Sequence, residues 1–295
     1  MKKNLFLISL LLLTFCTLAQ TDDYELYKAK AVKDMTEGKF ADAQKRFRLM
    51  MPYVTKTNKE DYDKILEVLQ DSIDNVYNRA IKLKNDKKYT LAISEFQKLI
   101  DRYNQPLKSP LYAYIGYCYE GSGLGSLSEL NYEMGLKYNE PLSALYLAKY
   151  IKKYDNTTTS ETIIELYKKA KEYPEAMDSL GVEYARIGNV NQSYKCYKQS
   201  NTPFAKYNMA SYILNSDSYP KLWTKFWHDD PIELLTEAAD AGYAPAQYYL
   251  GMLYYYAREG ERVEKNMTKG LKFIEKAASQ GYDRAKEMLY KIKYK

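Results

Sequence analysis

The chain has 295 residues, of which 46% are hydrophobic and 28% are charged, values that are ordinary for a soluble protein with a core. It contains 33 tyrosines but only 13 glycines and 9 prolines, and so few helix-breaking residues favour long helices over a sheet-rich fold. The formal net charge of +6 is small and dispersed along the chain, so nucleic acid is not expected as a partner.

Residues 1–19 predict a signal peptide that is removed on export. A basic start precedes an apolar run over 5–13, too short to span a bilayer, and small residues before Gln20 are typical of a cleavage site. Cys16 raises the alternative of a lipoprotein, but the bulky Phe15 stands where lipid attachment needs Gly, Ala or Ser. We therefore expect an unlipidated chain in a bacterial periplasm, at the outer-membrane face or in the medium.

From residue 21 onward the sequence predicts successive two-helix units. Each unit has one small residue in the middle of its first helix, where the second helix crosses closely. These residues are 29 to 49 positions apart, and most of the spacings lie near 34, the period of a known two-helix repeat. The positions are Ala31, Ala80, Gly116, Ala148, Gly181, Ala210 and Gly251.

The units differ in their regularity. Residues 50–61 are expected to lengthen the second helix of the first unit, or the linker after it, which accounts for the longest spacing. In the fourth unit a polar loop over 156–160 ends at Ser160, which looks like a helix start. The sixth unit is interrupted after Leu214, and its second helix is expected to open at Pro231, directly after an aspartate that suits a helix cap.

The last stretch, residues 237–289, repeats itself at an offset of 39 residues, which separates Ala246 from Ala285. In each half a glycine, Gly242 or Gly281, is expected to end the preceding helix. Small residues at such fixed offsets in helical sequence indicate two-helix units stacked side by side. The residues that carry a resemblance to a known repeat are Ala246, Leu250, Gly251 and Tyr254, followed by Lys276, Ala277, Ala278 and Gly281.

This pattern resembles the Sel-1-like repeat, a variant of the tetratricopeptide repeat. The resemblance covers roughly residues 21–295 and is strongest in the last 60. It implies an all-α fold: a right-handed α-solenoid of about seven two-helix units in one domain over 20–295. Units over 20–231 are similar to tetratricopeptide repeats and those over 232–295 to Sel-1-like repeats. The family implies an interaction scaffold.

In this family the first helices line the concave surface. Helical geometry puts residues three and two before, and one and four after, each small residue on that side. Five of six first helices place a tyrosine at this inner level, and the helix around Gly181 offers Asp178 and Ser179 instead. Tyrosine combines a large apolar face with a polar tip, which suits a wet, adaptable groove. The predicted partner-binding residues are Tyr77, Asn78, Tyr114, Tyr117, Tyr146, Lys149, Tyr207, Asn208, Tyr248, Tyr249, Met252 and Tyr255.

Leu250 and Gly251 are expected to point into the packing between helices. A second set of tyrosines occupies positions where these repeats use aromatic packing. We expect this set in the core: Tyr89, Tyr119, Tyr132, Tyr184, Tyr197 and Tyr254.

No constellation of residues predicts catalysis or a metal site. The chain has one histidine, His228, and no nucleophile motif accompanies it. The glycine-rich run over 121–125 lacks the lysine of a phosphate loop and follows a helix, so we expect a turn. Cys118 and Cys196 fall on non-adjacent units, and we expect two buried free thiols.

Trp223, Phe226 and Trp227 have the spacing of one helix face. They are expected either to fill the lengthened loop of the sixth unit or to form an exposed aromatic contact site.

These observations predict an exported, non-enzymatic scaffold, without cofactor or metal, that holds a peptide segment or helix of another envelope protein in a tyrosine-rich concave groove. The alternative is a binder of glycans or peptidoglycan fragments that uses the tyrosines as stacking platforms. The sequence leaves the oligomeric state open.

Overall fold

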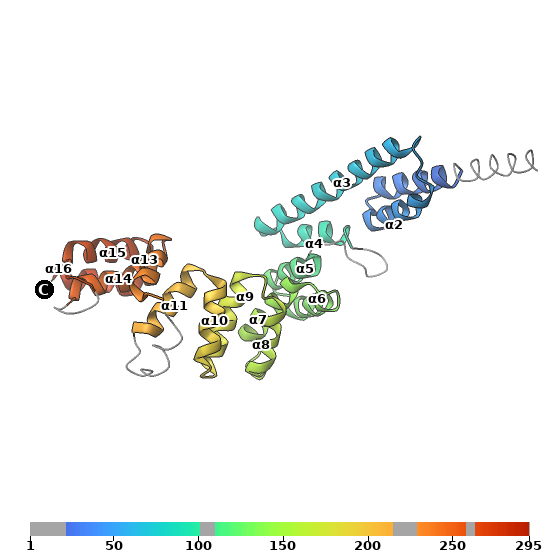
Figure 1. The fold of residues 1–295 in the computed structure, drawn as a ribbon. Helices are drawn as coiled ribbons and strands as arrows, with labels where there is room; N and C mark the ends of the chain where they lie inside the picture. The colour runs from blue at the N-terminus through green and yellow to red at the C-terminus, as the bar shows by residue number, and fades with distance from the viewer. Residues whose placement is uncertain (1–21, 101–109, 215–228, 258–262, 295) are drawn as a thin grey trace, which may run out of the picture. The chain divides into compact units, whose positions relative to one another are not determined.

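The computed structural model describes residues 22–100, 110–214, 229–257 and 263–294 (Figure 1). These residues form helices joined by turns and short connections, with no β-strand among them, so the predicted all-α fold is confirmed. No helix of the described ranges is long and apolar enough to cross a membrane. The chain divides into two compact units, residues 1–150 and 151–295, which we describe one at a time.

Unit 1 begins with a helix over 22–36 and continues as antiparallel helical pairs. Ring contacts connect neighbouring pairs, and one hydrophobic core runs from Tyr24 to Cys118. The elements are α2 (Phe40–Met50), the 3-10 helix η1 (Met51–Tyr53), α3 (Lys59–Asn85), α4 (Tyr89–Gln97), α5 (Leu111–Gly121), α6 (Gly125–Lys137) and α7 (Pro141–Tyr154), whose last turn belongs to unit 2.

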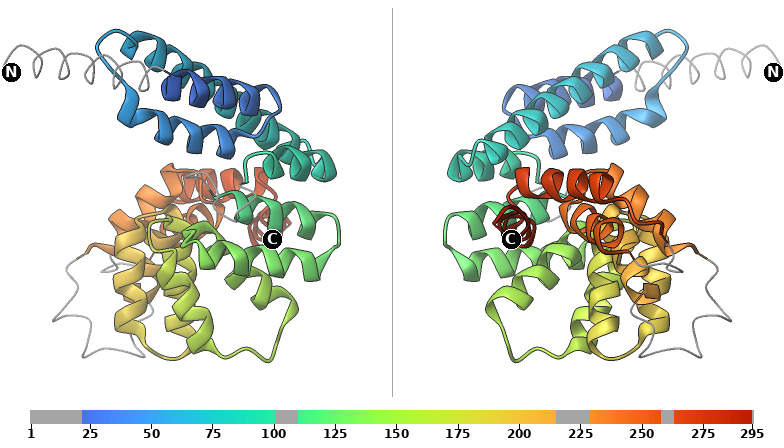
Figure 2. Two further views of the ribbon diagram at one scale, coloured as in Figure 1. Left: turned by 90° about the vertical axis from the view of Figure 1, so that its right-hand side faces the viewer. Right: turned by 90° about the vertical axis from the view of Figure 1, so that its left-hand side faces the viewer.

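Unit 2 continues the same architecture, and α14 and α15 lie side by side in the views of Figures 1 and 2. Gly242 and Gly281 have φ values of 88° and 90° and end the helices before them, as predicted. The elements are α8 (Ser160–Lys169), α9 (Pro174–Arg186), α10 (Val190–Ser200), α11 (Pro203–Leu214), α13 (Pro231–Asp240), α14 (Ala244–Tyr256), α15 (Met267–Ser279) and α16 (Asp283–Lys293).

The small residues predicted at the helix crossings are buried, and the glycines among them leave no room for a side chain. A Cβ on Gly116 would lie 2.5 Å from a ring carbon of Tyr132, and one on Gly181 would lie 2.4 Å from a ring carbon of Tyr197. Tyr132 and Tyr197 are fully buried, as predicted. The paired tyrosine therefore fills the space that each glycine leaves open.

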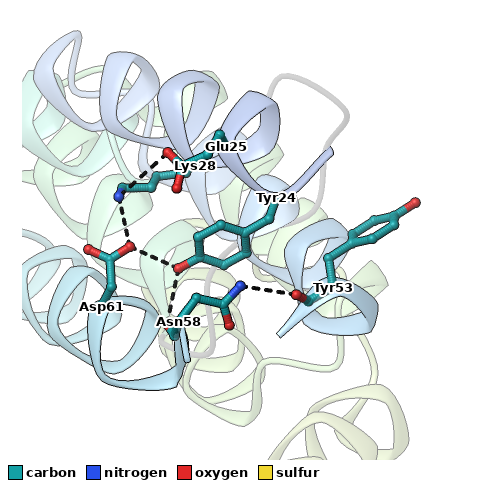
Figure 3. Close-up of polar contacts among 6 residues, drawn as sticks. All are labelled: Tyr24, Glu25, Lys28, Tyr53, Asn58 and Asp61. Atoms are coloured by element: carbon teal, nitrogen blue, oxygen red, sulfur yellow. Dashed lines mark hydrogen bonds and ion pairs between the residues drawn. The ribbon is translucent and has the colours of Figure 1, made fainter. Parts of the chain in front are cut away.

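A polar cluster ties the first helix of unit 1 to the start of α3 (Figure 3). The buried Tyr24 hydroxyl donates to Asp61 Oδ2 at 3.0 Å and to the Asn58 carbonyl at 3.3 Å. Lys28 Nζ lies 2.7 Å from the same Asp61 oxygen, and the Asn58 amide donates to the Tyr53 carbonyl at 3.1 Å. Burial and the hydrogen bond to Asp61 raise the pKa of Tyr24, so this hydroxyl keeps its proton.

Three boundaries refine the sequence prediction. The second helix of the first unit ends at Met50, and residues 51–58 form η1 and a linker, which was the other alternative for this stretch. The long first spacing also comes from α3, a first helix of 27 residues that starts at Lys59. Helix α8 begins at Ser160, as predicted, and its cap is Thr159, whose side chain accepts from the Thr162 backbone N–H. Helix α13 opens at Pro231 as predicted, with the preceding aspartate as its cap. One continuous domain over 20–295 with right-handed superhelical twist stays a prediction.

Candidate functional site

In unit 1 the predicted tyrosines lie on α3, α5 and α7, three successive first helices. The rings of Tyr77 on α3 and Tyr114 on α5 have centroids 6.4 Å apart, and Tyr114 also stacks on Phe96 of α4 at 5.5 Å. Tyr117 on α5 and Tyr146 on α7 have centroids 5.7 Å apart. The repeat therefore brings the predicted tyrosines into ring contact from one first helix to the next.

Lysine side chains lie over these rings. Lys84 Nζ is 5.3 Å from the ring centroid of Tyr114 and 5.1 Å from that of Tyr117, and Lys149 Nζ is 5.9 Å from that of Tyr146. These distances are in the range of cation–π attraction. Lys149 was predicted in the site and Lys84 was missed, although it stands four residues after Ala80, one of the offsets that mark the inner side.

The tyrosines of this face are only partly accessible. Tyr77 and Tyr114 pack against the core of unit 1, whereas Tyr117 is 39% exposed and Asn78 is exposed. Tyr89, predicted in the core, is partly buried and packs against the core of unit 1, and its ring centroid lies 6.4 Å from that of Tyr117. Tyr117 therefore offers the most accessible ring of this face, and Tyr77 and Tyr114 are partly covered by their neighbours.

In unit 2 the rings of Tyr207 on α11 and Tyr249 on α14 are 6.3 Å apart. Tyr243, just before α14, lies 5.6 Å from Tyr207 and was missed by the sequence prediction, which read only the helix positions. Burial raises the pKa of Tyr249 and of Tyr243, so their hydroxyls keep their protons. The side-chain amide of Asn208 donates to the Phe204 carbonyl of its own helix at 2.8 Å.

Further along α14, three predicted site residues pack against the core that α15 and α16 form. Tyr248, Met252 and Tyr255 are half-buried there, and the Tyr248 ring lies 5.5 Å from that of Tyr282 before α16. These three residues follow one another along the same side of α14, but part of each side chain is covered by the core and only the remainder is accessible to a partner.

The residues predicted to point between α14 and α15 do so. Leu250 and Gly251 are buried. The Tyr254 ring lies nearly parallel to that of Phe273 on α15, with centroids 6.4 Å apart, and Lys269 Nζ donates to the Tyr254 hydroxyl at 2.9 Å.

Asp178, the residue that α9 offers in place of a tyrosine, serves the fold. Its carboxylate accepts from the hydroxyl of Ser200, the last residue of α10, and, at 2.8 Å, from the hydroxyl of Thr202 in the connection to α11. Burial raises the pKa of Asp178. These hydrogen bonds join α9 to the end of α10 and to the connection that leads into α11, so Asp178 stabilises unit 2.

The thiols are buried and free, as predicted. Burial raises the pKa of both Cys118 and Cys196 to about 11, so neither thiol is ionised near neutral pH. The glycine-rich run over 121–125 ends α5, makes the turn over 122–124 and begins α6, so the predicted turn is confirmed. Among the described residues, no group of three or more His, Cys, Asp or Glu side chains could hold a metal ion.

Several predicted features lie outside the described residues. These are the signal peptide over 1–19, Cys16, Trp223, Phe226, Trp227 and His228.

No protein-family model matches this sequence, and no curated protein matches it. Among solved structures the chain is similar to a Sel1 repeat protein from Oxalobacter formigenes, with 20% identity, a TM-score of 0.60, and coverage of 74% of this chain and 90% of that one. It is also similar to a protective antigen with an SLR fold present in uropathogenic Escherichia coli strains, at 18% identity over 91% of this chain and 67% of that one, with a TM-score of 0.42. At identities of 20% or less the similarity concerns the fold alone, and the conclusion about the fold rests on the first structure, whose TM-score is the higher. The chain therefore has the all-α fold of the Sel-1-like repeats, the tetratricopeptide variant that its sequence resembles.

Proposed function

We propose that this chain is a non-enzymatic scaffold that binds a segment of another protein on the faces of its first helices. The observation that carries the proposal is the ring contact between tyrosines of successive first helices, Tyr77 with Tyr114 and Tyr117 with Tyr146. A partner segment that crosses these helices would meet one aromatic ring after another.

Two physical properties of these rings favour recognition. Each tyrosine offers a large apolar face together with a hydroxyl, as in interfaces that are partly hydrated. Because the rings are already fixed by their neighbours, little side-chain entropy is lost on binding. We further propose that the chain works after export to a bacterial envelope or medium, a proposal that rests on the sequence of residues 1–19.

Affinity capture tests the scaffold function. The chain over 20–295 is immobilised and exposed to a native envelope extract, and retained proteins are identified by mass spectrometry. We expect Tyr117→Ala to lower retention of the partner by about tenfold or more, as truncation of an aromatic anchor does. The control is Tyr290→Ala, which removes the same side chain from an exposed position on α16. Equal retention by wild type and Tyr117→Ala would contradict the proposal.

The same assay separates a protein segment from a glycan. Soluble peptidoglycan fragments are added during capture, and they should leave retention unchanged if the rings hold a protein segment. If fragments added at the same concentration as the immobilised chain lower the retention of the partner, stacking of the rings on glycan, the alternative function, is favoured.

A further inference from the structure

We infer that the segment held by unit 1 is acidic, and that one of its carboxylates is bound by Lys84 beside the rings of Tyr114 and Tyr117. The inference rests on the proposed function, because it names the chemistry of the partner at the same face.

Helix α3 carries Lys84, and α5 supplies the two rings that its ammonium faces. Lys84 stands seven residues after Tyr77, so both side chains lie on one face of the helix. Lys84 is partly buried as a residue, and its ammonium lies 5.3 Å and 5.1 Å from the ring centroids of Tyr114 and Tyr117. Two rings of the next first helix therefore hold one cation at a defined position.

The Lys84 ammonium has no carboxylate partner in the described part of unit 1. Two other cations of α3 are paired: Lys64 Nζ lies 2.7 Å from Glu60 and Arg79 lies 2.5 Å from Glu95. Lys84 differs from these two in facing aromatic rings instead of an acid. Its positive charge therefore lies on the tyrosine face without a carboxylate beside it among the described residues.

An ammonium has three N–H donors, and a ring face offers it electrostatic attraction but no strong acceptor. A carboxylate from a partner would supply those acceptors as charge-assisted hydrogen bonds. The flanking rings would cover the aliphatic part of an acidic side chain and exclude water from the ion pair. The geometry therefore fits a glutamate or aspartate better than a neutral or basic residue.

A second lysine lies over a ring of the next first helix. The Tyr117 ring lies 5.7 Å from Tyr146 on α7, and Lys149 Nζ lies 5.9 Å from the Tyr146 centroid. One cation at Lys84 flanked by aromatic rings suits a peptide in which an acidic residue has apolar neighbours. A polyphosphate chain is a poorer match, because its affinity comes from many cations along a continuous track.

The test uses random twelve-residue peptides displayed on phage and selected on the chain over 20–295. The best binder is synthesised in its selected form and with each acidic residue replaced by its amide. We expect the selected peptide to carry Asp or Glu, and Lys84→Met to weaken its binding by about tenfold or more, since a hydrogen bond to a charged group is lost. The control is Lys82→Met, an exposed lysine of the same helix. The amide peptide should bind wild type weakly and lose nothing further with Lys84→Met.

The outcomes separate this inference from the proposed function. A peptide that binds Lys84→Met as well as wild type but is lost with Tyr117→Ala would keep the scaffold and overturn the role of Lys84. Failure to enrich any peptide would contradict both proposals. Lys84-dependent binding of soluble acidic peptidoglycan fragments, with no peptide bound, would overturn the peptide as the occupant. Thermal unfolding of each variant must match wild type for the affinities to be compared.

Discussion

Glu183 on α9 is a carboxylate held inside the fold by two cations. Its side chain is 1% exposed, with Lys152 Nζ 2.5 Å from Oε1 and Arg186 Nε 3.0 Å from Oε2. Burial by itself would raise the pKa of Glu183, but the ion pairs with Lys152 and Arg186 together outweigh burial and lower it. The carboxylate is therefore ionised at neutral pH, and its charge contributes to the stability of unit 2.

This pairing makes stability depend on pH. Because the pKa of Glu183 is lower in the folded than in the unfolded chain, its contribution is fully present above its ordinary value of 4.5 and is lost as the pH falls through the folded value. We expect Glu183→Gln to lower the free energy of unfolding by about 1 to 2 kcal/mol at pH 7, a typical cost for a lost hydrogen bond to a charged group. At pH 3 the difference should shrink.

Urea unfolding at the two pH values measures this difference. The control is Glu165→Gln, an exposed acid paired with Lys168, which should change stability by less than about 1 kcal/mol at either pH. A loss that is the same at pH 7 and pH 3 would show that the charge of Glu183 is not the cause.

At the scale of the helix, close crossing of paired helices depends on glycine opposite tyrosine. A Cβ on Gly181 would lie 2.4 Å from a ring carbon of Tyr197, closer than nonbonded atoms approach. The ring cannot move away easily, because Tyr197 is buried and its ring also contacts Phe204 and Tyr212. The two helices would have to separate to admit one methyl group.

We therefore expect Gly181→Ala to destabilise the chain by about 1 to 3 kcal/mol, the usual cost of overpacking, even though alanine favours helix. Thermal or urea unfolding measures the effect. The double variant Gly181→Ala with Tyr197→Leu tests the cause, because removing the ring should make the added methyl nearly neutral. Strictly additive losses would mean that the ring is not the obstacle.

Many of the helix crossings and helix ends could be predicted from the sequence, because the residues that determine them lie within the helix or directly after it. Gly116 and Gly181 recur at repeat spacing, and the glycines after α13 and α15 end their helices. The length of α3 escaped prediction because its helical pattern continues from Lys59 without a break, and the residues before it were read as part of the preceding helix or linker.

The candidate site was predictable in outline and not in detail. The offsets from each small residue identified tyrosines that do meet across successive helices. They could not show how far each ring is buried, because that depends on neighbours outside the helix positions, such as Tyr243 and Tyr282. The role of Asp178 was hidden for the same reason, since its partners Ser200, at the end of α10, and Thr202, in the next connection, are more than 20 residues away.

At the scale of the whole chain, the proposed export can be tested directly, and it would place the scaffold together with its partner outside the cytoplasm. Expressed with its own first 19 residues in a bacterial host, the protein should be recovered outside the cytoplasm with the intact mass of residues 20–295. A chain that begins at Gln20 behind a new initiator should stay in the cytoplasm. Mass spectrometry that finds a diacylglyceryl group on Cys16 would contradict plain export.

Helix α3 also has a mechanical consequence. Its 27 residues span about 40 Å at 1.5 Å per residue. Near one end Tyr62 contacts Phe47 of α2, and near the other Tyr77 contacts Phe96 of α4. An unbroken helix of this length resists bending, so it keeps Asp61 of the polar cluster and Lys84 beside the rings of α5 at a separation of about 35 Å along one rigid element.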